Sequence, residues 1–96
     1  MFEIEIMPEA ESDLLRMPRF HAVAIMHMIR QTLLHEPVET NRSRIKLLKY
    51  VEPPTYRLRV GDWRVVYRVE TGAAMVRVLR VLAKEETEKY YEELQP

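Results

Sequence analysis

The sequence contains no cysteine among its 96 residues. A disulfide framework, a thiol nucleophile and thiolate metal ligands are therefore excluded, and the composition suits a reducing cytoplasm. The opening MFEIEIMPEAE has no basic leader followed by an apolar run, and nowhere do eighteen apolar residues occur in succession. We expect a soluble, unprocessed chain without a membrane partner. Its length allows one core but not two, so we expect a single domain over residues 1–96 with no separate cofactor domain.

An excess of one charge is also lacking, because fifteen Lys and Arg balance fifteen Asp and Glu. The charges are nevertheless segregated along the chain. Residues 1–41 carry three basic and seven acidic side chains, residues 42–84 eleven and three, and residues 85–96 one and five. A basic face concentrated in the middle segment can bind a phosphate backbone even on a neutral protein, although long-range steering is weaker.

Hydrophobic periodicity predicts one compact domain with the element order βααβββα. The stretch FEIEIM at residues 2–7 alternates apolar and acidic residues, as a half-buried strand does. Pro8 can open a helix that runs to about Arg16, and Pro18 can open a second helix that runs to about His35. The later elements are expected to be three strands and a charged C-terminal helix: Thr55–Val60, Trp63–Glu70, Ala74–Leu82 and residues 84–94.

The second predicted helix carries an apolar stripe that we expect to face the core. The stripe consists of Val23, Met26, Ile29 or Arg30, and Leu33, widened by Phe20, Ala24 and Leu34. The three histidines, at spacings of six and eight, also fall on this helix: His21, His27 and His35. Neither spacing makes a local metal pair, so surface histidines are favoured and no metal site is expected.

Two segments connect this helix to the later strands. VETNRSR, residues 38–44, has the composition of a linker. IKLLKYVEPPT, residues 45–55, is an apolar and basic approach to the strand that follows.

The stretch TYRLRVGDWRVVYRV, residues 55–69, is typical of a β-hairpin. Its Gly61-Asp62 dipeptide, with glycine in the first central position, suits a type II′ turn. This turn pairs Val60 with Trp63 and Arg59 with Arg64, and side chains then alternate between the two faces. One face is apolar, with Tyr56, Leu58, Val60, Trp63, Val65, Tyr67 and Val69, and the other collects Arg57, Arg59, Arg64 and Arg68.

A second turn at residues 71–72 would pair Glu70 with Ala73 and bring Arg77 opposite Val66, onto the basic face. Like charges that face each other across a ladder destabilise it by roughly 0.2–1 kcal/mol, so a purely structural surface has little reason to repeat them. One interpretation is an anion site, because guanidinium forks match phosphate oxygens. The alternative is a solvated outer face whose charges are relieved by Glu70, Glu85 or Glu86.

The hairpin resembles the RelE/ParE superfamily of toxins from bacterial and archaeal toxin-antitoxin pairs. The family pattern is a tyrosine, alternating basic residues, Gly-Asp-aromatic-Arg, aliphatics and a second tyrosine. It is matched by Tyr56, Arg57, Arg59, Gly61, Asp62, Trp63, Arg64 and Tyr67. The resemblance covers nearly the whole chain and implies a small α+β domain. In such a domain a twisted antiparallel sheet packs on two N-terminal helices and uses its open face for function.

The resemblance leaves the branch of the superfamily open. RelE-like members enter the ribosomal A site and cut the messenger, whereas ParE-like members poison DNA gyrase. Antitoxins of the family wrap the toxin and often shift or block its C-terminal helix. The implied partners are therefore a cognate antitoxin, which can form a toxin-antitoxin heterotetramer, and either the ribosome with mRNA or DNA gyrase. A non-cleaving binding domain of the same fold is a further alternative.

The catalytic set of RelE-like members can be carried over by position, as the resemblance implies. Arg57 and Arg59 occupy the alternating basic positions, and Arg64 follows the Gly-Asp-aromatic triplet. Lys84 falls where relatives often have an arginine, and Tyr90 matches a tyrosine six residues further on. Further phosphate contacts are expected from Lys46, Lys49, Arg68 and Arg77.

The implied chemistry needs neither metal nor cofactor, because the RNA 2′-hydroxyl attacks the neighbouring phosphate and leaves a cyclic phosphate and a 5′-hydroxyl. Arginines suit the phosphate, and Tyr90 can stack on a base or orient it. Arginine cannot act as the general base, because it does not lose its proton. Lys84 is the best remaining candidate, with Glu85 behind it, although it can also donate a proton or simply add charge. We expect a slow, substrate-assisted nuclease, or a branch member that does not cleave.

Overall fold

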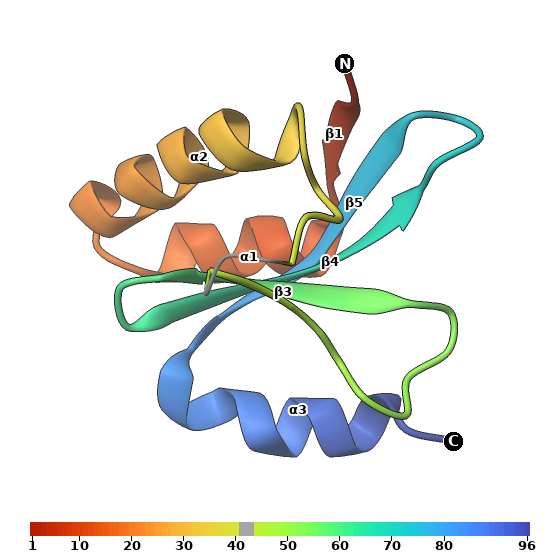
Figure 1. Cartoon of the computed structure of the whole chain (residues 1–96). Coiled ribbons are helices and arrows are strands. Elements are labelled where there is room, and N and C mark those ends of the chain that lie inside the picture. The colour runs from red at the N-terminus through yellow and green to blue at the C-terminus, as the bar shows by residue number, and fades with distance from the viewer. Residues whose placement is uncertain (41–43) are drawn as a thin grey trace.

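The computed structural model describes residues 1–40 and 44–96, so the middle of the predicted linker, residues 41–43, lies outside the described residues. Figure 1 shows a sheet with helices on both sides. The elements follow the expected order, with one additional strand: β1 (Glu3–Ile6), α1 (Pro8–Arg16), α2 (Arg19–Leu33), β2 (Ile45–Leu47), β3 (Thr55–Val60), β4 (Trp63–Glu70), β5 (Met75–Ala83), the 3₁₀ turn η1 (Lys84–Glu86) and α3 (Thr87–Leu94). The α+β class is confirmed.

The five strands form one sheet in the order β1-β5-β4-β3-β2. The strands from β2 to β5 are antiparallel to their neighbours, but β1 runs parallel to β5, with Glu3 beside Met75 and Ile6 beside Val78. The sheet is therefore mixed, where the family resemblance implied an antiparallel one. Parallel pairing requires a long connection, and the two helices and three strands between β1 and β5 provide it.

The additional strand, β2, lies in the segment that the sequence pattern presented only as an approach to the hairpin. Its residues pair with β3, Ile45 opposite Leu58 and Leu47 opposite Tyr56. The strand has three residues, and only Ile45 is buried. A strand this short shows no period of two, so its sequence pattern does not distinguish it from a loop.

The helices α1 and α2 lie on one side of the sheet and α3 lies on the other (Figure 1). In α2 the buried residues are Ile25, Ile29 and Leu33. The predicted stripe was therefore wrong for Phe20 and Val23, which are 76% and 59% exposed, and for Ala24, which is exposed as well. Apolar residues occur on several sides of this helix, so periodicity alone did not fix which side faces the sheet. No helix in residues 1–40 and 44–96 is long and apolar enough to cross a membrane.

The predicted hairpin is confirmed in its register. Val60 faces Trp63 and Arg59 faces Arg64. Gly61 has a φ of 58°, as the first central position of a type II′ turn requires. The apolar face also lies where expected: its seven side chains belong to the core between the sheet and α1 and α2 or pack against it.

The second turn was predicted wrongly. Glu70 faces Met75 rather than Ala73, and residues 71–74 form the connection, closed by a 3.1 Å hydrogen bond from the Ala74 amide to the Thr71 carbonyl. Ala74 itself has a φ of 50°, which the sequence pattern gave no reason to expect at an alanine when Gly72 lies two residues before it. The two extra residues change the register of all of β5 against β4.

A β-bulge in β5 adds a second shift. Val66 of β4 faces Arg80 and Tyr67 faces Val78, so Leu79 is the extra residue of β5. Arg80, rather than the predicted Arg77, therefore stands opposite Val66. Arg77 still lies on the predicted basic face, opposite Arg68.

Candidate nucleic-acid interface

The sheet face opposite α1 and α2 concentrates cationic side chains, and we call it the arginine face. Directly opposed residues share a face, so the register places these side chains in rows. One row joins Lys46, Arg57, Val66 and Arg80 across four strands. The arginine face comprises Lys46, Arg57, Arg59, Arg64, Arg68, Arg77 and Arg80. Of these, Arg80 alone was missed by the sequence prediction.

Like charges face each other repeatedly on the arginine face. The cross-strand pairs are Arg59 with Arg64, Arg68 with Arg77, and Lys46 with Arg57. Each such pair destabilises a ladder by roughly 0.2–1 kcal/mol. Only the first pair was predicted, so the electrostatic cost built into this face is larger than the sequence pattern indicated.

Acidic side chains neutralise the end of the arginine face nearest β1. Arg77 Nε lies 2.9 Å from Glu5 Oε1, and Arg77 Nη1 lies 3.6 Å from Glu70 Oε2. Arg80 Nε lies 2.7 Å from Asp13 Oδ2, and the hydrogen bonding to Asp13 raises the pKa of Arg80. The alternative of an acid-relieved surface therefore describes this end of the face.

At the other end of the arginine face, Arg57 and Arg64 donate to backbone carbonyl oxygens. Arg57 Nη1 donates to the Arg44 carbonyl oxygen at 3.1 Å, and Arg64 Nη1 donates to the carbonyl oxygens of Gly61 and Trp63 at 2.8 and 2.9 Å. Within the described part of the chain, neither guanidinium has a carboxylate at ion-pair distance. Burial and the neighbouring Arg64 lower the pKa of Arg57. A bound anion would relieve this repulsion.

The remaining predicted phosphate contacts surround these two arginines. Arg68 Nε donates to Thr55 Oγ1 at 3.0 Å, which holds its guanidinium along the sheet. Arg59 is exposed on β3, and Lys46 is exposed on β2. Lys49 is also exposed, but it lies in the turn after β2 and outside the cross-strand rows. The structure thus gathers the predicted residues around β3 and β4, with Lys49 at the periphery.

Lys84 lies directly after β5, in η1. Its backbone N–H donates to the Asp62 carbonyl oxygen at 2.8 Å, which ties the end of β5 to the hairpin turn. The side chains of Lys84 and Glu85 are both exposed. Lys84 therefore lies beside the hairpin turn, which comes just before Arg64 at the start of β4.

The C-terminal helix lies against the arginine face. Its half-buried residues share one side of α3, at the spacing of a helix that packs on a surface: Thr87, Tyr90, Tyr91 and Leu94. Val66 and Leu82 project from the arginine face yet are 0% and 5% exposed, and they lie outside the core formed with α1 and α2. We conclude that α3 buries the centre of the arginine face and leaves its edges open.

Two consecutive tyrosines of α3 lie near different arginines. The ring of Tyr90 lies under Arg80, with 5.4 Å between the guanidinium carbon and the ring centroid. The hydroxyl of Tyr91 is buried, and the side chain of Thr87 is the polar group next to it, although no described residue completes a hydrogen bond of full geometry with this hydroxyl. Burial raises the pKa of Tyr91, while the nearby Arg57 and Arg64 favour its ionised form. The tyrosine near the predicted catalytic arginines is thus Tyr91. Tyr90, which was predicted to be catalytic, has its ring under Arg80 instead.

The histidines do not lie close together with other potential metal ligands in the described chain. Among residues 1–40 and 44–96, no three His, Cys, Asp or Glu side chains gather closely enough to hold a metal ion. His21 instead packs between two aromatic rings, with centroid distances of 4.8 Å to Phe20 and 5.8 Å to Trp63.

Sequence reasoning missed Asp13 and Arg80 as a linked pair. Arg80 was overlooked because the bulge at Leu79 is not visible in the sequence. Asp13 could have been found, because Ala10, Asp13 and Met17 lie at spacings of three and four on the buried side of α1. An acid on the apolar stripe of a helix needs a partner inside the protein.

Comparison with known sequences identifies the family of this chain. Residues 4–88 match the family described as the ParE toxin of type II toxin-antitoxin system, parDE. No curated protein matches the sequence.

Solved structures with the same fold are toxins and toxin-antitoxin complexes. The RelBE2 complex of Mycobacterium tuberculosis is 25% identical with a TM-score of 0.73, covering 85% of this chain and 96% of that one. The RelE-RelB complex of Pyrococcus horikoshii is 23% identical with a TM-score of 0.72, covering 88% and 97%. The isolated RelE toxin of E. coli is 19% identical with a TM-score of 0.70, covering 97% and 95%. The chain therefore belongs to the ParE toxin family of type II toxin-antitoxin systems, within the RelE/ParE superfamily.

Proposed function

We propose that this toxin is a ribosome-dependent mRNA endoribonuclease that inhibits translation. One observation carries the proposal: the buried hydroxyl of Tyr91 makes no hydrogen bond of full geometry within the described residues, and the arginines near it, Arg57 and Arg64, have no acidic partner there. A buried polar group without a partner calls for an explanation, and a bound phosphodiester supplies one. Guanidinium groups in a partly dry site stabilise charge that develops on such a phosphate.

The proposed reaction is metal-independent. The 2′-hydroxyl of the RNA attacks the adjacent phosphorus, the bond to the 5′-oxygen breaks, and the products are a cyclic phosphate and a 5′-hydroxyl. Arg57, Arg59 and Arg64 contact the phosphate oxygens and offset their growing charge. Tyr91 donates a hydrogen bond to the phosphate, and Tyr90 keeps the alternative role of orienting a base.

Proton transfer is the slow part of this mechanism. No histidine lies on the arginine face, because all three belong to α2 or to the turn after it. The arginines stay protonated, so Lys84 takes or returns the proton with Glu85 nearby. We infer a slow nuclease in which the ribosome orients the RNA for in-line attack, and Lys46, Lys49 and Arg68 make further phosphate contacts.

A cognate antitoxin is the partner expected of a toxin in this family. Structural relatives from M. tuberculosis and P. horikoshii were solved as complexes with antitoxins. We propose that the antitoxin of this toxin places acidic side chains against the arginine face, within a heterotetramer in the cytoplasm. A small reading frame beside the toxin gene is the expected source of this partner.

Cell-free translation with mapping of mRNA ends tests the proposed activity. The purified toxin should arrest translation and cut mRNA within codons only when ribosomes are present, and the cut ends should carry a cyclic phosphate and a 5′-hydroxyl. Arg64→Ala should abolish cutting, whereas Arg30→Ala, an exposed arginine on α2, should not. Intact mRNA in the presence of folded toxin would contradict the proposal.

The second candidate function is inhibition of DNA gyrase, which the match to the ParE family model favours. A supercoiling assay run beside the translation assay separates the two functions. A gyrase inhibitor should block supercoiling and leave translation intact. If the toxin inhibits neither translation nor supercoiling, it is a binding domain that does not cleave RNA.

A further inference from the structure

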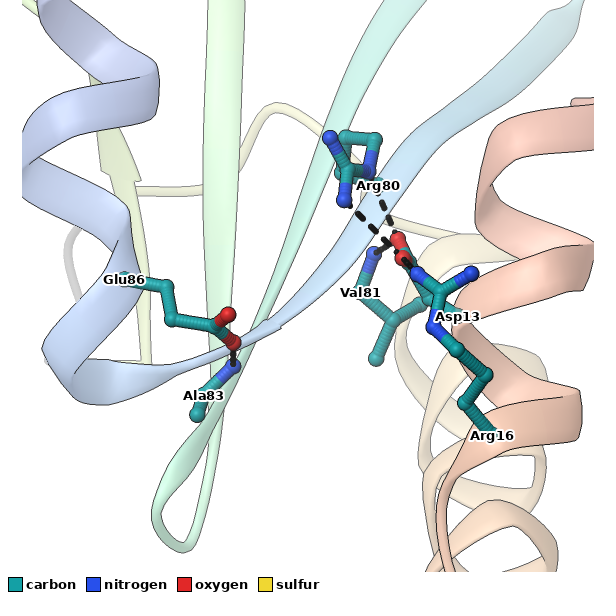
Figure 2. A network of polar contacts seen from close by, with 6 residues as sticks. All are labelled: Asp13, Arg16, Arg80, Val81, Ala83 and Glu86. Carbon is teal, nitrogen blue, oxygen red and sulfur yellow. Dashed lines mark hydrogen bonds and ion pairs between the residues drawn. The ribbon is translucent and has the colours of Figure 1, made fainter.

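One carboxylate outside the proposed catalytic cluster is buried and saturated with contacts. The side chain of Asp13, on α1, is 3% exposed. Its Oδ2 accepts hydrogen bonds from Arg80 Nε at 2.7 Å and from the Val81 amide at 2.9 Å. Its Oδ1 accepts from Arg80 Nη2 at 3.0 Å and from Arg16 Nη2 at 2.6 Å. Figure 2 shows both arginines converging on this carboxylate from opposite sides.

The place of Asp13 follows from the sheet topology. The pairing of β1 with β5 ends at Ile6 and Val78, followed by one hydrogen bond from the Met7 amide to the Val78 carbonyl. The outer edge of β5 beyond that point has no strand beside it, and α1 covers it instead. Asp13 supplies the acceptor that a neighbouring strand would have offered to the Val81 amide.

Arg80 is held in place by a two-pronged contact with Asp13. Two of its nitrogens donate to the two oxygens of Asp13, which fixes the plane of the guanidinium group. The held guanidinium stands 5.4 Å from the centroid of the Tyr90 ring, within the range of a cation–π interaction. A chain of contacts thus runs from α1, around the edge of β5, to α3.

The position of α3 depends on few contacts. It has eight residues and no fully buried side chain. A helix of this length is not stable alone in water, so its place must come from tertiary contacts. Tyr91 follows Tyr90 directly, so any contact that fixes Tyr90 also fixes the position of the Tyr91 hydroxyl.

We propose that Asp13 and Arg80 are positioning residues, which hold α3 through Tyr90 and so place the Tyr91 hydroxyl beside Arg57 and Arg64. Neither residue needs to touch the RNA. Asp13 reaches α3 only through Arg80, so its effect on the helix is indirect. The placement of α3 stands on the contacts above, and its consequence for activity rests on the proposed nuclease function.

Hydrogen exchange of the α3 amides tests the placement without any assay of activity. Arg80→Met keeps the apolar stem and removes the charge, so exchange at residues 87–94 should accelerate roughly three- to tenfold, the range expected for a lost cation–π contact. Asp13→Asn should accelerate the same amides although Asp13 lies on α1. Arg16→Met is the matched control, because it removes the other arginine of the same carboxylate, and α3 should exchange as in the parent.

Unchanged exchange of α3 in folded Arg80→Met protein would overturn the proposal, as would equal acceleration in Arg16→Met. If Asp13→Asn fails to fold, Arg80→Met still decides, because the buried Asp13 carboxylate keeps its ion pair with Arg16 and its hydrogen bond from the Val81 amide in that variant. A second readout is the pKa of Tyr91, followed by NMR of the labelled rings. It should fall toward its ordinary value in Arg80→Met and stay raised in Arg16→Met.

The activity arm separates this inference from the proposed function. With an active nuclease, Arg80→Met should lower kcat with little change in KM, since the RNA contacts remain. Unaltered kcat despite faster α3 exchange would show that the placement does not serve catalysis. If the parent protein does not cut mRNA, the nuclease proposal fails, while the exchange and Tyr91 measurements still decide whether Asp13 and Arg80 position α3.

Discussion

Arg64 and Arg77 lie on the same face of the sheet, but their surroundings differ. Arg77 has Glu5 at 2.9 Å and Glu70 at 3.6 Å, whereas Arg64 donates only to carbonyl oxygens at the hairpin turn and faces Arg59. A cation kept without an acid and opposite another cation is costly for stability. We therefore expect function to reside in Arg64.

Arg64→Ala should abolish most activity without weakening the fold. A lost charge-assisted contact in a water-excluded site lowers the rate on the order of a hundredfold to a thousandfold. The free energy of unfolding should fall by less than about 0.5 kcal/mol, or should rise, because the repulsion between Arg64 and Arg59 is relieved. Cleavage and melting temperature measured on the same preparation check this, and full activity in a folded variant would refute it.

The two tyrosines of α3 allow a finer comparison. Tyr91→Phe removes a buried hydroxyl that makes no hydrogen bond of full geometry with any described residue, so the variant should be as stable as the parent or more stable, by up to about 1–3 kcal/mol. Its cleavage rate should nevertheless fall if the hydroxyl contacts the phosphate. Tyr90→Phe keeps a ring under Arg80 and should retain most activity. The reverse pattern would assign the hydroxyl role to Tyr90.

At the scale of the elements, Tyr67 joins β4 to the segment that follows α2. Its buried hydroxyl donates to the Pro37 carbonyl oxygen at 2.6 Å, and burial raises its pKa. The neutral form is thus favoured in the folded state. This contribution to stability is complete below the unfolded pKa, near 10, and is lost as pH rises from there toward the folded value.

Tyr67→Phe should therefore cost about 1 kcal/mol at neutral pH and flatten the alkaline side of the stability profile. Above about pH 10 the parent should lose stability faster than the variant. Urea unfolding between neutral pH and pH 11 measures both. Because Tyr90 and Tyr91 titrate in both proteins, the difference between the curves isolates Tyr67, and parallel curves would contradict its assignment.

At the scale of the whole molecule, the uneven distribution of charge should appear in the salt dependence of RNA binding. Contacts from Arg57, Arg59 and Arg64 to a single strand predict a slope of about −2 in a plot of log K against log salt, at about −0.7 per phosphate. Arg64→Ala should make the slope shallower by about 0.7. Arg77→Ala should change it less, because Glu5 and Glu70 already offset that charge.

The sequence predicted well wherever a local rule governs the structure. Glycine at position 61 determined the hairpin turn, and that turn determined which residues face each other, including Arg59 and Arg64. Pro8 and Pro18 likewise marked where α1 and α2 begin. These features depend on the backbone preferences of one or two residues.

Other features depend on contacts between distant parts of the chain. The three-residue β2 exists because β3 lies beside it, and the pairing of Asp13 with Arg80 brings together residues on α1 and β5. The register of β5 depends on a positive φ at Ala74 and on the bulge at Leu79, and the residue types at these positions predict neither feature. The arginine face was predicted, but its division into a neutralised and an un-neutralised end was not.

The bulge at Leu79 reverses the parity of β5. Before it, the even-numbered Val76 and Val78 face the helices, and after it the odd-numbered Val81 does so. Leu79 is the one residue of β5 that no residue of β4 faces, so the strand contains one residue more than its pairing needs. Without Leu79 the strand would alternate regularly from Val78 to Arg80 and Val81, which keeps Arg80 on the arginine face and Val81 toward the helices. We therefore expect this domain to tolerate deletion of Leu79 about as well as its substitution, which is unusual for a position inside a strand.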